Sequence, residues 1–170
     1  MSKTTKSNLE HEVTFLIKSL PENFSKFPSK DIKQGYFSGG NDALRIRQSG
    51  DKFELTKKIQ ISPNDFSKFE EITIQIKPEE FKVLWPQVIS STEKTRFLFP
   101  LGKLTIEIDV FKAKMSGLII AEVEFPDQKS FEEFEKPQWF GRDVTQDRWV
   151  AGNFLAGKSF GDIKKFMQEK

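Results

Sequence analysis

The sequence predicts an α+β fold dominated by antiparallel strands, and three observations lead to this prediction. Seven short segments alternate apolar and polar residues, which is the period of a strand with one buried face. Turn-forming residues separate these segments, for example Gly50 with Asp51 and Ser116 with Gly117. Stretches with helical spacing lie between and after them. The expected strands are residues 9–17, 43–49, 52–60, 71–77, 92–99, 103–111 and 118–125.

The expected helices are shorter and fewer than the strands. Proline near the first position favours two helix starts, because its fixed φ suits the first helical turn. In the C-terminal stretch Phe160, Ile163 and Phe166 recur at three-residue spacing, which indicates one apolar helix face. The expected helices are residues 62–66, 78–85, 130–135 and 157–169.

Length and cysteine content narrow the class of protein. A chain of 170 residues is long enough for one core, so residues 9–170 are expected to form a single domain after a disordered leader, residues 1–8. The chain has no cysteine and one histidine, His11, which excludes disulfides, thiolate chemistry and metal sites built from several imidazoles. Any metal is therefore expected on carboxylates, which suit Mg²⁺ or Mn²⁺.

Net charge and hydropathy limit which classes of partner and which cellular compartment are expected. The chain carries 27 Lys and Arg against 25 Asp and Glu, an excess too small for a dedicated nucleic-acid binder. No apolar run reaches transmembrane length, and residues 1–8 contain no signal-peptide core. We therefore expect a cytoplasmic protein with no nucleic-acid partner and no membrane partner.

The charged residues are sorted between strands, which is the first indication of function. Side chains two apart on a strand share a face, and several strands carry pairs of like charge at this spacing. Like charges on one face repel unless a counter-charge, a metal or a bound anion lies nearby. The acidic pairs are Glu10 with Glu12, Glu107 with Asp109 and Glu122 with Glu124, and the basic pairs are Arg45 with Arg47 and Lys94 with Arg96.

Two interpretations of this pattern remain open at this point. The charged faces belong to an ordinary half-buried sheet in contact with water, or to a sheet that closes with its charged face inward. In a closed sheet the acids would hold a cation, and the bases would hold the phosphates that the cation bridges.

A series of short motifs follows the predicted strands. In the N-terminal half they are LEHEVTFL at residues 9–16, QGY at 34–36, LRIR at 44–47 and LTKK at 55–58. In the C-terminal half they are EKTRF at 93–97, LTIEID at 104–109, AEVEF at 121–125 and WFGRDVT at 139–145. Their order and spacing, from about residue 9 to residue 156, resemble the CYTH superfamily of triphosphate tunnel metalloenzymes, most closely its short bacterial members.

The resemblance implies both a fold and an activity. The fold would be a closed eight-stranded antiparallel β-barrel, a tunnel, with helices packed outside. The activity would be metal-dependent hydrolysis of inorganic triphosphate or of a related organic triphosphate. Mg²⁺ or Mn²⁺ would be the cofactor and a small-molecule triphosphate the partner, and a monomer and a homodimer are both compatible with this activity.

The functional residues of the family transfer to the positions that match its motifs. Carboxylates on three expected strands would hold the metal: Glu10, Glu12, Glu107, Asp109, Glu122 and Glu124. Bases would bind the phosphates, because arginine in particular donates two bonds to one phosphate. These bases are Arg45, Arg47, Lys58, Lys94, Arg96 and Arg142. The catalytic group would be Glu10, Glu12 and Thr14, and for Arg142 a salt bridge with a nearby acid is an equal alternative.

Three positions depart from the pattern of the family. Thr14 replaces the lysine that ends its ExExK motif, and Thr73 and Gln75 stand where many members carry acids. A threonine donates a hydrogen bond but cannot neutralise charge. The alternative to an enzyme is therefore a non-catalytic or very slow polyphosphate- or nucleotide-binding module. Lys52 and Glu54 are expected to be peripheral.

Overall fold

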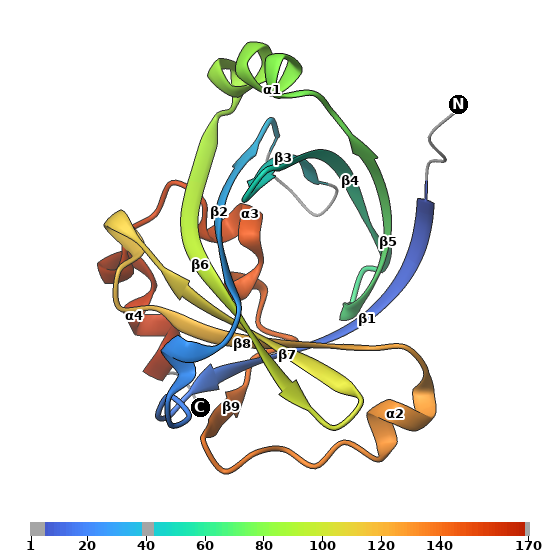
Figure 1. Cartoon of the computed structure of the whole chain (residues 1–170), viewed down its shortest axis with the longest axis vertical. Coiled ribbons are helices and arrows are strands. Elements are labelled where there is room, and N and C mark those ends of the chain that lie inside the picture. The colour runs from blue at the N-terminus through green and yellow to red at the C-terminus, as the bar shows by residue number, and fades with distance from the viewer. Residues whose placement is uncertain (1–5, 39–42, 169–170) are drawn as a thin grey trace.

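The computed structural model describes residues 6–38 and 43–168, with residues 6–10 described by their backbone alone. The strands within these residues are β1 (Lys6–Ile17), β2 (Ser29–Tyr36), β3 (Ala43–Ser49), β4 (Lys52–Ser62), β5 (Asp65–Gln75), β6 (Ser90–Leu101), β7 (Leu104–Phe111), β8 (Ile119–Phe125) and β9 (Phe140–Asp143). They pair antiparallel in the order β5-β4-β3-β2-β6-β7-β8-β1, and β1 also pairs with β5 (Figure 1). This pairing confirms the predicted closed eight-stranded barrel, and β9 pairs with β1 outside it.

Strand alternation places the charged side chains inside the barrel. On β1, Glu12 lines the interior, whereas Val13 and Phe15 are buried in an apolar cluster on the outer face. The register of β1 on β8 sets Glu12 directly across from Glu124, so acids of neighbouring strands meet on one face. The second interpretation of the sorted charges, a sheet closed with its charged face inward, is therefore confirmed.

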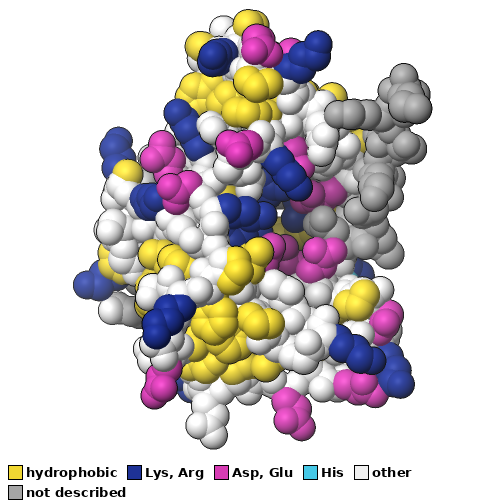
Figure 2. Space-filling model, viewed as in Figure 1, with side chains coloured by type: hydrophobic (Ala, Val, Ile, Leu, Met, Phe, Trp, Pro, Cys, Tyr) yellow, Lys and Arg dark blue, Asp and Glu magenta, His cyan; other side chains and the backbone are white. Residues whose placement is uncertain are grey.

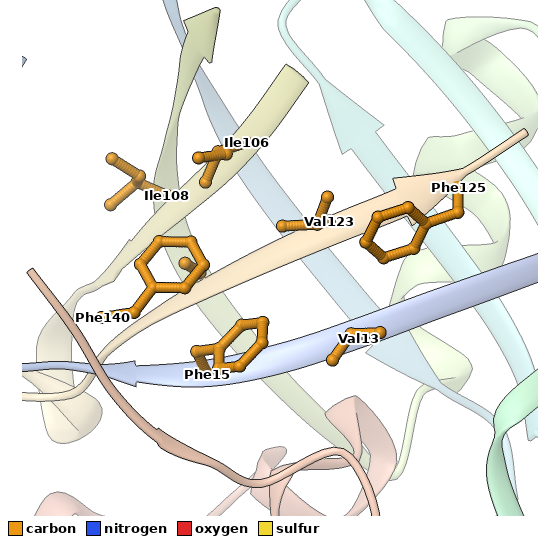
Figure 3. Packing of buried hydrophobic residues seen from close by; sticks show 8 residues of the cluster. Val13, Phe15, Ile106, Ile108, Val123, Phe125 and Phe140 are labelled. Atoms are coloured by element: carbon orange, nitrogen blue, oxygen red, sulfur yellow. The ribbon is translucent and has the colours of Figure 1, made fainter. Parts of the chain in front are cut away.

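The apolar outer faces of β1, β7 and β8 form the main core. Side chains from these strands pack with Phe140 of β9, as Figure 3 shows. Burial of each such side chain contributes about 1.5–3 kcal/mol. Because the outer faces of these strands carry the apolar contacts, the interior of the barrel can be polar. The cluster comprises Val13, Phe15, Ile106, Ile108, Ala121, Val123, Phe125 and Phe140.

Helices lie outside the barrel: α1 (Pro78–Leu84), α2 (Gln128–Glu132), α3 (Gly152–Leu155) and α4 (Phe160–Gln168). Single 3₁₀ turns, η1 (Phe24–Lys26), η2 (Trp85–Gln87), η3 (Ala113–Met115) and η4 (Arg148–Val150), join the other elements. Three expected helices are confirmed with different bounds: 78–85 is α1, 130–135 overlaps α2, which ends at Glu132, and 157–169 contains α4, which begins at Phe160. Ile163 of α4 is fully buried, as its spacing predicts, in a second apolar cluster that includes Ile120 of β8 and Leu155 of α3. In the part of the chain that the structure describes, no helix has the length and apolarity needed to cross a bilayer.

The structure corrects three local expectations. Residues 62–66 do not form a helix: Ser62 ends β4 and Asp65 begins β5, and the Asp65 carboxylate accepts hydrogen bonds from the Ser67 N–H (2.9 Å) and hydroxyl (2.6 Å). The strands β2 and β9 were missing from the prediction, because β2 carries polar residues on both faces and β9 has only four residues. β1 begins at Lys6, inside the expected leader, and residues 1–5 lie outside the described residues.

Candidate active site

The barrel encloses a cavity of about 340 Å³, which is the size of a small-ligand site. Its wall consists of inward-facing side chains from the strands together with residues 145–155. Figure 2 shows a hollow in which Lys, Arg, Asp and Glu side chains gather. The charged residues that the sequence singled out are therefore assembled around one space.

Bases outnumber acids on the part of the wall formed by β3, β4 and β5, which we call the basic half. Arg45 and Lys58 both contact Glu71, at 3.6 and 3.1 Å, and Arg47 donates to Glu54 at 3.1 Å. Burial alone would raise the pKa of Glu71, but Arg45 and Lys58 outweigh it and lower the pKa. The charge of Arg45, followed by burial, lowers the pKa of Arg47. An anion in the cavity would relieve this repulsion between neighbouring guanidinium groups.

Acids outnumber bases on the part formed by β6, β7 and β8, which we call the acidic half. Its charged members are Lys94, Arg96, Glu107, Asp109, Glu122 and Glu124. Register brings the acids of β7 and β8 together, because Glu107 lies directly across from Glu122. Glu12 of β1 lies directly across from Glu124 of β8, so carboxylates of three neighbouring strands line this part of the cavity.

Arg96 is the centre of the ion pairs in the acidic half. It donates to Asp109 from Nε and Nη2, both at 2.6 Å, and also to Glu107 and Glu122. Lys94 donates to the same Asp109 carboxylate, which is fully buried. Burial would raise the pKa of Asp109, but Arg96 and then Lys94 lower it to about 2. Both Asp109 oxygens are therefore bonded to bases in this structure, and the role of Asp109 as a metal ligand stays a prediction.

Glu124 differs from the acids that are paired with bases. Burial, Glu107 and Glu71 raise the pKa of Glu124, and Lys58 only partly offsets them. No hydrogen bond or ion pair joins its carboxylate to any other described residue. A cation near Glu12 and Glu124 would lower the cost of holding these carboxylates ionised together.

Residues 144–157 lie across one end of the barrel, which we call the covered end. The Thr145 hydroxyl accepts a hydrogen bond from the Thr14 N–H at 3.0 Å, and Gly157 N–H donates to the Ser91 carbonyl at 3.0 Å. Gly152 approaches Tyr36 so closely that a Cβ would lie 2.3 Å from the Tyr36 hydroxyl, which only glycine permits. Thr14 is buried at this end and lines the cavity.

Comparison with known proteins identifies the chain. No family profile matches it. An inorganic triphosphatase of Nitrosomonas europaea is 35% identical over 152 residues, which cover 86% of this chain and 96% of the relative. The chain belongs to the CYTH family of triphosphate tunnel enzymes. A second relative, an inorganic triphosphatase of Acetivibrio thermocellus, is 34% identical over 126 residues, 72% of this chain and 78% of the relative.

The solved structures agree with the assignment to the CYTH family. The crystal structure of the inorganic triphosphatase NE1496 matches with a TM-score of 0.64 and 32% identity, over 86% of this chain and 93% of that structure. This likeness extends over nearly the whole barrel, so the tunnel described above is the fold of the family.

Most of the site residues predicted for a CYTH protein line the cavity, and the exceptions are Asp109, which is buried behind Arg96 and Lys94, Arg142 and Glu10. Arg142 lies outside the cavity, where it donates to Asp147 at 2.6 Å and to the Phe166 carbonyl at 3.1 Å. The alternative salt bridge is therefore confirmed, and Arg142 does not line the cavity in this structure. The Glu10 side chain lies outside the described residues, although its backbone pairs with Phe69 of β5. The residues found in the cavity wall are Glu12, Thr14, Arg45, Arg47, Lys58, Lys94, Arg96, Glu107, Glu122 and Glu124.

Sequence reasoning missed several members of the CYTH cavity wall. Lys30, Gln34 and Tyr36 share the inner face of β2, and Arg148 reaches the cavity from η4. The QGY motif pointed to two of these residues, and counting back by twos from Gln34 would have found Lys30. Glu54, expected to be peripheral, instead pairs with Arg47.

The chemistry of the acidic wall is compatible with a divalent metal in this CYTH tunnel. Among the described residues, no group of three or more carboxylates is close enough to hold an ion without other ligands. Mg²⁺ is usually held by one or two carboxylates together with substrate phosphates and water, so three protein ligands are not required. Burial and, after it, the charges of Glu107 and Glu71 raise the pKa of Glu124, and a cation at this wall would offset both effects. The donor set therefore fits a hard cation that binds with a phosphate ligand.

Proposed function

We propose that this chain is a metal-dependent triphosphatase that hydrolyses inorganic triphosphate or a related organic triphosphate inside the tunnel. The observation that carries the proposal is the division of one cavity wall into a basic and an acidic half. A triphosphate with a divalent cation has the complementary distribution of charge. The proposal agrees with the names of the two relatives, both inorganic triphosphatases. We also propose a cytoplasmic location and a substrate of low molecular weight.

In the proposed complex the phosphates bind the basic half. Arg45, Arg47 and Lys58 donate to phosphate oxygens, and an arginine can make two such bonds at once. Each of these bases already contacts an acid, Glu71 or Glu54, which holds its side chain in the cavity before substrate arrives. Catalysis by such a site depends on positioning and charge stabilisation rather than on a covalent intermediate.

In the same proposal Glu12, Glu122 and Glu124 hold the divalent metal, with Glu10 as a further candidate ligand. When bound, this metal supplies charge neutralisation for the phosphates and a more acidic water. Lys94 and Arg96 complete the cavity between the two halves, and Asp109 holds both of them in place. Thr14 contributes a hydroxyl group at the covered end, where the family pattern has a cation.

The alternative, a binding module without turnover, rests on Thr14, Thr73 and Gln75. Thr73 shares a hydrogen bond of 2.9 Å with Thr56 across β4 and β5, so this part of the wall is packed without an acid. Three carboxylates nevertheless line the cavity on β1 and β8, and bases face them, which is why we favour the enzyme.

Release of phosphate measures the proposed function directly. Inorganic triphosphate, ATP and thiamine triphosphate are incubated with the protein and Mg²⁺ or Mn²⁺, with and without chelator. We expect release from inorganic triphosphate that chelator abolishes. Binding of inorganic triphosphate by calorimetry without release from any substrate would instead establish the binding module.

A further inference from the structure

Lys30 is a cavity-lining base that neither the family pattern nor the sorted charges point to. It lies at the start of β2, on the same inner face as Gln34 and Tyr36. Tyr36 lies at the covered end, six residues further along, which corresponds to about 20 Å of strand. Lys30 therefore lies at the opposite end, which we call the open end because Lys30 and Glu124 are both exposed and both line the cavity there.

Lys30 differs from the neighbouring bases of the tunnel in its ion pairing. Register sets Lys30 directly across from Arg96, and both side chains face the cavity. Arg96 uses its donors on Asp109, Glu107 and Glu122, so four of the five N–H groups of its guanidinium are engaged. By contrast, no hydrogen bond, ion pair or ring contact joins the Lys30 side chain to any other residue that the structure describes.

The surroundings of Lys30 favour an anion from the cavity. Partial burial lowers the pKa of Lys30 and the charges of Arg96 and Arg47 lower it further, whereas Glu107 and Glu54 raise it and only partly offset these effects. Two arginines therefore lie near an ammonium group that has no carboxylate bonded to it. Like charges in this arrangement repel each other, and a phosphate oxygen that bonds to Lys30 would remove the repulsion.

We propose that Lys30 is a substrate-positioning residue that extends the phosphate-binding surface from the basic half to the open end of the tunnel. This inference rests on the proposed function. Arg96 has almost no donor left for substrate, so Lys30 binds the terminal phosphate at this end. The charge missing at Thr14, near the covered end, is thus present on Lys30 at the open end.

The position of Lys30 also bears on which triphosphates fit. Residues 144–157 cover the other end, so an organic group attached to a triphosphate has to extend past Lys30 toward the open end. An unsubstituted polyphosphate places a further negative charge there, whereas the cationic thiazolium of thiamine triphosphate meets a like charge. Lys30 therefore favours inorganic polyphosphates over thiamine triphosphate.

Steady-state hydrolysis by the Lys30→Met variant is the test, with Lys30→Arg and Lys33→Met for comparison. Lys33 is a matched control, because it lies on the same strand but on the outer face, 4.3 Å from the centre of the Trp85 ring. We expect Lys30→Met to raise KM for inorganic triphosphate about tenfold with little change in kcat, because the lost bond is charge-assisted and made in substrate and transition state alike. Lys30→Arg should restore most of the affinity, and high salt should reduce the difference.

Substrate preference provides the second measurement. The ratio of kcat/KM for inorganic triphosphate to that for thiamine triphosphate should fall in Lys30→Met and stay constant in Lys33→Met. An unchanged KM for inorganic triphosphate in Lys30→Met, or an equal change in Lys33→Met, would overturn the inference.

The outcome can be separated from failure of the proposed function. If the wild-type chain hydrolyses no triphosphate, the triphosphatase proposal fails, and calorimetric binding of inorganic triphosphate is compared in the same variants. Binding about tenfold weaker in Lys30→Met than in Lys33→Met would still support the role of Lys30. Equal binding in the two variants would refute it.

Discussion

The basic and acidic halves of the tunnel wall hold their charges in different ways. In the basic half, Arg45 and Lys58 share one acid, Glu71, and each makes a contact longer than 3 Å. In the acidic half, Arg96 is bonded to three carboxylates and Asp109 to two bases. The longer contacts of the basic half agree with the proposal that a phosphate replaces Glu71 as the partner of these bases. The acidic half is in part a structural network, and only its outermost carboxylates are left for a cation.

Of the changes proposed here, removal of the Asp109 carboxylate should have the largest effect, a loss of folding stability. Asp109→Asn leaves Arg96 and Lys94 buried with too little negative charge, and loss of one partner of a buried ion pair costs about 3–5 kcal/mol. Urea unfolding at pH 7 measures the free energy of unfolding. Because the pKa of Asp109 is lowered, its contribution is present above the ordinary Asp value and lost as pH falls toward 2. The exposed Asp31→Asn is the control, and equal losses in the two variants would show that Asp109 is not structural.

Replacement of the two β8 carboxylates by neutral amides should prevent metal binding at the proposed site. We expect Glu122→Gln with Glu124→Gln to abolish the rise in melting temperature caused by Mg²⁺ or Mn²⁺ and to lower hydrolysis at least about a hundredfold. Scanning fluorimetry with each metal and with chelator measures the first effect. Glu93→Gln, an exposed substitution on β6, serves as control. A metal-induced shift that persists in the double variant would place the cation elsewhere.

A lysine at position 14 should add a positive charge to the cavity wall at the covered end. Thr14 lines the cavity, so Thr14→Lys brings a cation to the covered end and should raise kcat for inorganic triphosphate about tenfold, a part of what one such contact contributes. The measurement is initial-rate phosphate release at saturating substrate, with the exposed Ser25→Lys as control. An unchanged rate would mean that Thr14 is not where a catalytic cation is missing.

The smallest expected effect concerns Glu124 in the absence of metal. Because its pKa is raised in the folded state, the folded protein loses stability as pH rises from the ordinary Glu value through the raised one. Glu124→Gln should therefore be more stable than wild type at pH 7 and equal to it near pH 4. The gain should be under about 1 kcal/mol, since the side chain is partly exposed and solvent screens it. Unfolding with chelator at both pH values tests this, and a loss of stability at pH 7 would contradict it.

Much of the fold could be predicted from the sequence because its strands alternate strictly. Positions such as Val13 and Ile108 are apolar and their neighbours on β1 and β7 are charged or polar, so both faces could be assigned from the sequence. β2 escaped prediction because its outer face is polar, with Asp31 and Lys33, and its inner face mixes Lys30 and Gln34 with the apolar Ile32. Alternation carries no signal where neither face is apolar.

The candidate site was likewise predictable in part from local sequence spacing and in part not. The sequence by itself determined which charges share a face, because side chains two apart on a strand point the same way. Tertiary structure alone decided which opposite charges meet. Sheet closure and register gave Asp109 to Arg96 and Lys94, placed Arg142 beside Asp147 outside the cavity, and left Lys30 with no carboxylate among the described residues. Pairing between strands depends on contacts between residues far apart in the chain, which no local spacing records.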